Sequence, residues 1–290
     1  MENIKLNNNG RSRVNNLIFL FDNIVIEMII SFKNIKFFFL YLFSDTFKFL
    51  KNNAELKDLL INKKVFILGN GPSINKYDLT KLNNQNVIMV NRSFKHKDYE
   101  IIKPNFHFFV DNKMSNGIWP LTYVDEVFLK NPTCKIFLNA DWYHLSNFKH
   151  LRNNKQIYWI KFTLISLIND NFKSDFTKIV TAGSSVVDCA ITLSIHLGST
   201  DINILGVEGN GIAHLMCNQD SHFNGKDVDY DDHNSLLFAN DMISSARSIR
   251  QWHQTAKFLK KRKINIYNLT NEGILDAYRY KDFTQSLLDN

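Results

Sequence analysis

The sequence predicts an α/β fold in which a mostly parallel sheet is flanked by helices and preceded by an apolar helical extension. From Lys63 onward, short apolar runs rich in β-branched and aromatic residues recur, and each ends in a polar residue or glycine. Helical stretches separate several of these runs. Strands buried on both faces of a parallel sheet have this continuous apolar pattern. With 290 residues, 44% of them hydrophobic, the chain can bury a core of that kind.

The extension comprises residues 1–60, and residues 61–290 form the sheet domain. Its apolar stretch is "LIFLFDNIVIEMIISFKNIKFFFLYLFSDTFKFLKN", which five charged residues interrupt: Asp22, Glu27, Lys33, Lys36 and Asp45. No uncharged run of 18 residues exists, so we do not expect a membrane-spanning helix. Two interpretations are open: helices packed on the main domain, or a membrane-surface segment whose lysines face lipid headgroups.

Seven strands are expected, in the runs "KKVFILGN", "NVIMVNR", "FHFFVDN", "CKIFLNA", "QIYWIKF", "DINILGVE" and "KINIYNLT", with helices at 184–197 and 240–261. Ligands of parallel sheets bind beyond the carboxyl ends of the strands, so the residues that close these runs are site candidates. They are Gly69, Asn70, Gly71, Pro72, Ser73, Asn91, Asp111, Asn112, Glu208 and Asn210.

Charge and cysteine content narrow the partners. The formal charge of +7 favours anionic partners, but the cationic residues are scattered and no RNA-reading or zinc-finger motif occurs, so nucleic acid is not expected. Cys134, Cys189 and Cys217 lie far apart, without a C-x-x-C pair, which argues against disulfides and structural zinc. The start has no signal-peptide pattern, so we expect a cytoplasmic protein.

The loop "GNGPS", residues 69–73, suggests phosphate binding. Glycines let the backbone turn tightly near a ligand, and a helix start offers free N–H groups to an anion. A dinucleotide fingerprint would need a third glycine where Ile74 stands, and a P-loop would need Gly-Lys-Ser/Thr. The loop is therefore a two-glycine turn with Ser73 placed to cap a helix, or a plain strand-to-helix turn.

A second cluster of small residues precedes the helix at 184–197. Thr181, Gly183, Ser184 and Ser185 gather hydroxyls and N–H groups at its N-terminus. This pattern fits a second anion cradle, and it equally fits ordinary capping by Ser184 or Ser185.

A polar loop at 218–234 forms the third cluster. His222 is a candidate general base, since histidine titrates near neutral pH, and polar surface is the plainer alternative. The loop also holds a run of acids that offers D-x-D pairs for a divalent ion, or a solvated acidic loop: Asp227, Asp229, Asp231 and Asp232. His253, in the helix after this loop, is the second choice as base.

Together the motifs resemble a bacterial family. The segments are "FILGNGPSIN", "VNRSF", "VDN", "TAGSSVVDCAITLSIHLGSTDINILGVEGN", "SHFNG" and "KINIYNLTNEGILDAYRYKDF", spread over residues 62–283. The family includes 6-hydroxymethylpterin diphosphokinase MptE-like proteins, motility-associated flagellin glycosyltransferases and proteins of surface-polysaccharide clusters. The resemblance implies a Rossmann-like catalytic domain that binds a nucleotide-linked sugar.

The first loop also resembles the donor loop of bacterial lipooligosaccharide sialyltransferases, which use a CMP-activated nonulosonic acid. Gly69 to Ser73 match that loop, Asn91 matches their second-strand asparagine, and Thr181 and Gly183 match their central threonine and glycine. Their base histidine aligns with Ala246, so His222 would have to replace it.

The expected function is therefore glycosyl transfer in the assembly of capsule, O-antigen or lipooligosaccharide, from a CMP-linked, sialic-acid-like donor to a glycan or lipid-linked acceptor. N–H groups and hydroxyls would stabilise the leaving phosphate without a metal or other cofactor. Asp111 or Glu208 would stabilise the cationic glycosyl centre, or bind ribose or an amino sugar, while a base takes the acceptor proton. The enzyme would work in the cytoplasm, with contact to the inner face of the membrane as the open question.

Two alternatives remain. One is an ATP-dependent diphosphokinase acting on a small heterocycle, with magnesium held by Asp111 and the acids of 227–232. The other is a nucleotide-binding protein without catalysis. The sequence does not predict the oligomeric state.

Overall fold

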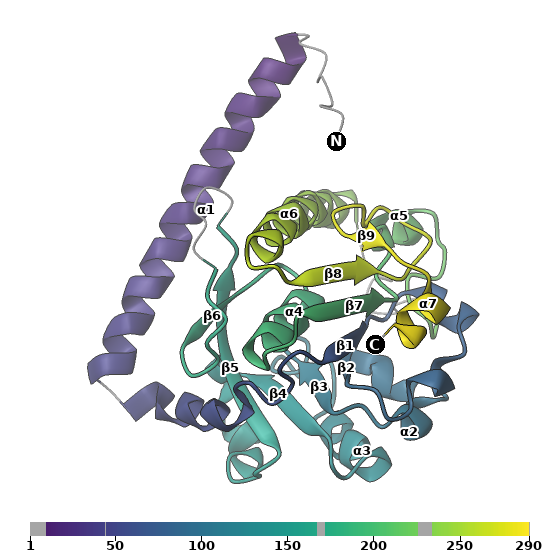
Figure 1. Cartoon of the computed structure of the whole chain (residues 1–290). Coiled ribbons are helices and arrows are strands. Elements are labelled where there is room, and N and C mark those ends of the chain that lie inside the picture. Colours follow the sequence, from purple (N-terminus) through teal and green to yellow (C-terminus); the bar gives the residue numbers. More distant parts are fainter. Residues whose placement is uncertain (1–9, 44, 167–171, 226–233, 290) are drawn as a thin grey trace.

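The computed structural model describes residues 10–43, 45–166, 172–225 and 234–289. Within these residues one parallel sheet forms, in the order β6-β5-β4-β3-β2-β1-β7-β8-β9 (Figure 1). The strands are β1 Lys64–Leu68, β2 Val87–Val90, β3 Phe106–Phe109, β4 Lys135–Asn139, β5 Ile157–Leu164, β6 Ile179–Ala182, β7 Asp201–Leu205, β8 Asn265–Asn268 and β9 Arg279–Tyr280. The α/β fold predicted from the sequence is confirmed.

Helices flank the sheet and precede it. The α-helices are α1 Gly10–Phe43, α2 Tyr99–Ile102, α3 Thr122–Lys130, α4 Val186–His196, α5 Gly211–Met216, α6 Ser235–Lys261 and α7 Phe283–Leu288. The 3-10 helices are η1 Asp45–Leu56, η2 Pro72–Lys76, η3 Leu79–Leu82, η4 Asn91–Lys95, η5 Ala140–Trp142 and η6 Ser146–Leu151. The two predicted long helices are present with shifted starts, at Val186 and at Ser235.

Strands β6 and β9 were not predicted. The four residues of β6, "IVTA", directly precede the glycine and serines of the second cluster, and the pattern was interpreted only as a loop before a helix. The two residues of β9 contain no apolar run at all. Both strands exist because a neighbouring strand offers its backbone groups, which a sequence pattern does not display.

Both faces of the sheet are buried, as the continuous apolar runs predict. In β1, Val65 and Ile67 pack in the same core as α4 and the C-terminal half of α6. Phe66 and Leu68 point to the other face, in a core that includes Leu50 of η1 and Phe37 of α1. The extension thus contributes to the core of the main domain.

Polar contacts also hold the extension. The buried Asn53 donates from Nδ2 to the carbonyl oxygens of Trp159 and Phe176, both at 2.8 Å. On α1, Asp22 accepts two hydrogen bonds from Arg247 of α6, at 2.6 and 3.2 Å. In the part of the chain that the structure describes, no helix is long and apolar enough to cross a membrane.

The strand order reverses direction between β1 and β7. The chain builds β1 to β6 outward on one side and then returns to place β7 on the other side of β1. Ligands of open α/β sheets bind at the carboxyl edge near such a reversal. The loops after β1 and β7 are therefore the first place to look for a site.

Candidate functional site

The glycines of the first loop allow the loops after β1 and β7 to lie in direct backbone contact. Gly69 N–H donates to Leu205 O at 2.8 Å, and Gly71 N–H donates to Gly206 O at 2.9 Å. A Cβ atom on Gly69 would lie 2.2 Å from Gly206 O, far inside van der Waals contact. Glycine is required at residue 69 because the two backbones touch there.

The carboxylate of Glu208 fills this loop. Ser73 N–H donates to Glu208 Oε1 at 2.9 Å, and a Cβ on Gly71 would lie 1.6 Å from Glu208 Oε2. The buried carboxylate thus takes the place that an anion would occupy at this helix start. The expected capping role of Ser73 is wrong: Gly71 is the N-cap of η2, and the buried Ser73 hydroxyl has no hydrogen-bond partner in the described part of the chain.

The segment that contains His222 lies against the same loop. Phe223 N–H donates to Asn70 O, and Asn75 Nδ2 donates to Phe223 O, both at 2.8 Å. The side-chain oxygen of Asn70 is buried without a hydrogen-bond partner. The structure therefore brings His222 near the first loop, as a half-buried side chain.

The four aspartates of the third cluster and the alternative base, His253, are not placed at the first loop. Asp227, Asp229, Asp231 and Asp232 lie outside the described residues. Among the side chains that are described, no three of His, Cys, Asp or Glu form a group that could hold a metal. His253 is exposed and lies 3.4 Å from Asp276.

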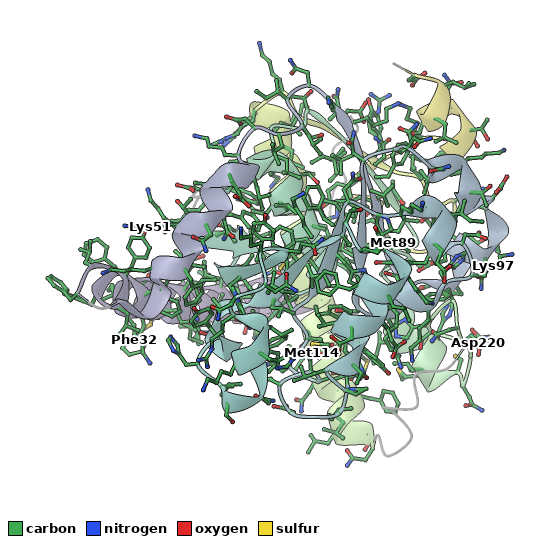
Figure 2. All side chains as sticks on the ribbon, turned by 90° about the horizontal axis from the view of Figure 1, so that it is seen from below. Phe32, Lys51, Met89, Lys97, Met114 and Asp220 are labelled. Atoms are coloured by element: carbon green, nitrogen blue, oxygen red, sulfur yellow. The ribbon has the colours of Figure 1, made fainter. Side chains whose placement is uncertain are left out.

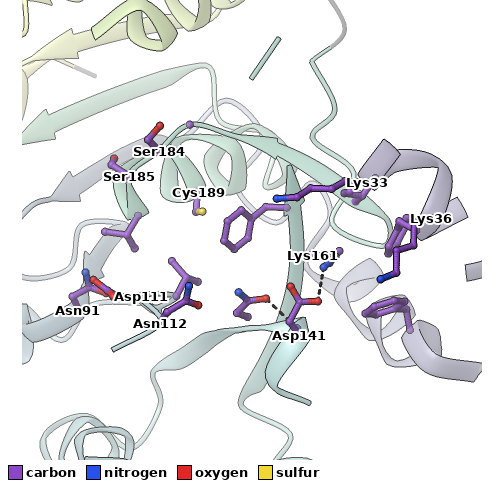
Figure 3. A pocket seen from close by; sticks show the side chains of 18 of the residues that line it. Lys33, Lys36, Asn91, Asp111, Asn112, Asp141, Lys161, Ser184, Ser185 and Cys189 are labelled. Atoms are coloured by element: carbon purple, nitrogen blue, oxygen red, sulfur yellow. Dashed lines mark hydrogen bonds and ion pairs between the residues drawn. The ribbon is translucent and has the colours of Figure 1, made fainter. Parts of the chain in front are cut away.

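A cavity of about 870 Å³ opens along the carboxyl ends of β2 to β6, under α1 (Figure 3). Its polar lining comes from the ends of successive strands and from α1: Asn91, Asp111, Asn112, Asn139, Asp141, Lys161, Ser184, Ser185, Lys33 and Lys36. Apolar walls come from Phe37, Leu40, Phe47 and Phe162 among others. A large cavity with a few converging polar groups is the usual form of a small-molecule site.

The predicted residues thus fall into two groups at one edge of the sheet. Asn91, Asp111, Asn112 and residues 183–185 line the cavity. The first loop, Glu208 and the His222 segment form the neighbouring group over β1 and β7. Asn210 is the N-cap residue of α5, beyond β7. Thr181 is buried in β6, where its hydroxyl oxygen accepts from Lys173 N–H at 2.9 Å.

Asn91 is held in place from behind the cavity. Burial lowers the pKa of His107 to about 3, so its ring is neutral and carries one N–H. Because Nε2 lies 2.8 Å from the carbonyl oxygen of Asn91, Nε2 must donate, and Nδ1 accepts from Tyr99 OH at 3.1 Å. Asn91 adopts the left-handed conformation, with φ of 48°, and its side-chain oxygen is buried without a hydrogen-bond partner among the described residues.

In the second cluster the backbone N–H groups already have acceptors. Gln251 Oε1 accepts from the N–H and the hydroxyl of Ser184, at 2.9 and 2.8 Å. Asp188 Oδ2 accepts from Ser185 N–H at 3.0 Å, and burial raises the pKa of Asp188 to about 6. A Cβ on Gly183 would lie 2.1 Å from the same oxygen. Both glycine loops therefore enclose a carboxylate of the chain itself.

Three lysines, which the sequence analysis did not name as site residues, make the cavity basic. Lys33 and Lys36 point from α1 toward the cavity (Figure 3), and neither forms an ion pair with another described residue. Lys161 of β5 is paired with Asp141. A lysine within the apolar run "IYWIKF" was the available signal, since a buried strand rarely carries a charge without a use for it. The two lysines of α1 gave no such signal.

A family model described as 6-hydroxymethylpterin diphosphokinase MptE-like matches residues 31–210, more than half of the chain. The protein therefore belongs to the MptE-like family, which confirms the resemblance found in the motifs. The matched segment includes every residue that lines the cavity and the whole first loop, whereas His222 and His253 lie beyond it.

One solved structure that matches is the MAf glycosyltransferase from Magnetospirillum magneticum AMB-1, with 12% identity and a TM-score of 0.43. The match covers 83% of this chain and 39% of that longer protein. Similarity at this level supports no conclusion about function. No curated protein matches the sequence.

Proposed function

We propose that the protein is a glycosyltransferase that binds a nucleotide-activated sugar in the cavity under α1. The observation that carries this proposal is the charge of the cavity. Two lysines without an ion-pair partner among the described residues, together with Lys161, face a space of about 870 Å³ at the carboxyl edge of a parallel sheet. A space of that volume is within the range of pockets that bury molecules of nucleotide size. Lysine side chains bind phosphate as compact positive charges.

Lys33 and Lys36 would bind the donor phosphate in this proposal. A CMP-linked sugar leaves with a single phosphate, whose charge two ammonium groups can stabilise without a metal ion. Asn91 would donate from its side-chain amide to the base or the ribose, while His107 holds its backbone carbonyl in place. Asp111, half-buried on the cavity wall, would face the cationic glycosyl centre.

The general base is proposed from the sequence alone. His222 lies beside the first loop, on the same edge of the sheet as the cavity, and would take the proton of the acceptor hydroxyl. The acidic, sialic-acid-like donor, the acceptor on a glycan or a lipid carrier, and the role in surface-polysaccharide assembly rest on the resemblance of the motifs.

A second candidate is transfer of a diphosphoryl group from ATP to a small heterocycle. It is favoured by the description of the family itself and by two carboxylates, Asp111 and Asp141, on the wall of the same cavity. Carboxylates of this kind hold magnesium on the phosphates of ATP. In this reaction Lys161 would have to release Asp141.

A thermal-shift measurement with CMP, UDP, GDP and ATP, each with and without magnesium, tests the two candidates. A ligand at a hundred times its Kd adds about 2.7 kcal/mol to the free energy of unfolding, which raises Tm by a few degrees. We expect stabilisation by CMP without metal, reduced in Lys36→Ala. Lys51→Ala is the matched control, because Lys51 is exposed and is not among the described residues that line the cavity.

Each outcome decides between the candidates. Stabilisation by ATP only with magnesium would replace the glycosyltransferase by the diphosphokinase. Stabilisation by UDP or GDP would keep glycosyl transfer and discard the CMP donor. Equal responses of Lys36→Ala and the wild-type protein to CMP would refute the assignment of the phosphate site. Hydrolysis of the CMP-sugar that is unchanged in His222→Ala would remove His222 from the mechanism.

A further inference from the structure

Helix α1 turns one apolar face away from the rest of the protein. Only Ile26, Ile30 and Phe37 among its described side chains are buried apolar residues. The large apolar side chains on the opposite side, which we call the outer face, are between 41% and 77% exposed. They recur at helical spacing and include Phe21, Met28, Phe32, Ile35, Phe39 and Phe43. Figure 2 shows Phe32 at the rim of the molecule, well away from Met89 in the core.

The outer face is broad, long and almost entirely apolar. At 100° per residue, the exposed apolar side chains between Leu17 and Phe43 span an arc of about 180°, in which the described polar residues are Ser31 and, near one edge, Lys36. At 1.5 Å per residue, these 27 positions extend over about 40 Å. A patch this large on a soluble surface marks an interaction site.

The charges of α1 are distributed unevenly around this face. Its two described acids are turned to the protein, where Asp22 pairs with Arg247 and Glu27 accepts from Ser166. Lys33 and Lys36 lie along one edge of the face and have no ion-pair partner among the residues the structure describes. The rim of the apolar face is therefore net positive, which complements an anionic surface.

A lipid surface fits these observations better than a second copy of the chain. Two helices that pack together bury a narrow seam on each and would leave most of an arc of about 180° in water. An amphipathic helix that lies in a bilayer interface buries its whole apolar face about 5–10 Å deep, with lysines at the headgroups. The length of α1 suits this arrangement, since nothing limits how far a helix may extend in the membrane plane.

We infer that α1 lies flat on an anionic membrane, with its outer face in the lipid and with Lys33 and Lys36 at the level of the headgroups. The same two lysines line the cavity, so its wall on the α1 side lies at the membrane surface. This docking does not depend on the reaction proposed above, because vesicles alone reveal it.

Sedimentation with vesicles of phosphatidylcholine, with or without phosphatidylglycerol, tests the inference on the full chain. We expect binding that is stronger to the anionic vesicles and weaker at high salt. Phe32→Glu together with Phe39→Glu should weaken it about a hundredfold, about tenfold for each aromatic side chain kept out of lipid. Both side chains are more than half exposed, so the variant should fold, which circular dichroism would verify.

Leu129→Glu is the matched control, because Leu129 on α3 is 84% exposed and lies outside the outer face. It should bind vesicles like the wild-type protein. Wild-type protein that stays in the supernatant with both vesicle types would overturn the inference. The inference would also be overturned if the wild-type protein were a dimer and the Phe32→Glu, Phe39→Glu variant a monomer. The outer face would then bind a second copy of the chain.

Discussion

Replacing Gly71 by alanine should reveal whether Glu208 is the anion of the first loop. Gly71 has a φ of −65°, which alanine adopts without strain, so any cost must come from contacts. A Cβ atom would lie 1.6 Å from Glu208 Oε2 and 2.3 Å from Cδ. Because ordinary contact begins near 3.4 Å, the whole carboxylate has to leave the loop.

The cost follows from what the carboxylate loses. Its hydrogen bond from Ser73 N–H, at 2.9 Å, joins a buried charge to a buried donor. Breaking such a bond and leaving both groups buried costs about 2–3 kcal/mol. For a chain of this size the corresponding fall in Tm is about 4–12 °C.

A double-mutant cycle isolates this contact. We expect Gly71→Ala to lower the free energy of unfolding by that amount in the wild-type protein and to cost almost nothing in a Glu208→Ala background, by urea denaturation. Gly211→Ala is the control, since no atom lies within 4 Å of a Cβ placed there. Equal costs of Gly71→Ala in both backgrounds would refute the reasoning and leave the Ser73 N–H available to a phosphate.

Three further predictions concern groups around the cavity. His107→Gln tests the buried imidazole, whose pKa is about 3 in the folded protein and 6.5 in the unfolded chain. As the pH falls below about 6.5, the wild-type protein should therefore lose about 1.4 kcal/mol of unfolding free energy per pH unit relative to this variant. Parallel stability curves of the two proteins would contradict this prediction. Asp188→Asn should show the opposite pH dependence, because burial raises the pKa of Asp188 from 3.8 to about 6. The wild-type protein should lose stability relative to the variant as the pH rises from about 4 to 6. A constant difference in stability over that range would argue against a buried carboxyl group that is protonated at low pH. Asn91→Gly keeps the left-handed backbone and removes a side-chain oxygen that has no hydrogen-bond partner among the described residues. We therefore expect an unchanged Tm and, measured by titration calorimetry, nucleotide binding that is about tenfold weaker. A large fall in Tm with normal binding would make Asn91 a structural residue.

The fold could be predicted because burial determines it. Runs such as "VFIL" and "VIMV" are apolar at every position, which only a strand covered on both faces accommodates. The strand order could not be read in the same way, since apolar residues indicate burial and not the neighbour. The return of β7 to the side of β1 brings the loops after these two strands into contact, and it therefore depends on tertiary packing that the local sequence pattern does not show.

The site was predictable only where strand ends supply it. Asn91, Asp111 and Asn112 follow β2 and β3 directly, so their place on one edge of the sheet follows from the parallel pattern. Lys33 and Lys36 reach the same cavity through the packing of α1, which depends on contacts of Phe37 and Asn53 with residues far along the chain. The carboxylate in the first loop was also hidden, because Glu208 is 135 residues from Ser73.

The hydrogen bonds of Asn53 have a consequence for the order of events during synthesis. Its partners, Trp159 and Phe176, lie 106 and 123 residues later in the chain. At translation rates of about 5–20 residues per second, the ribosome needs about 5–20 s to complete β5 after Asn53 has been made. For that interval α1 has no sheet to pack on, and both its buried side and its outer face are open to water. An exposed apolar helix of this kind binds other apolar surfaces. The extension would therefore contact the membrane or a chaperone before the cavity that it covers has formed.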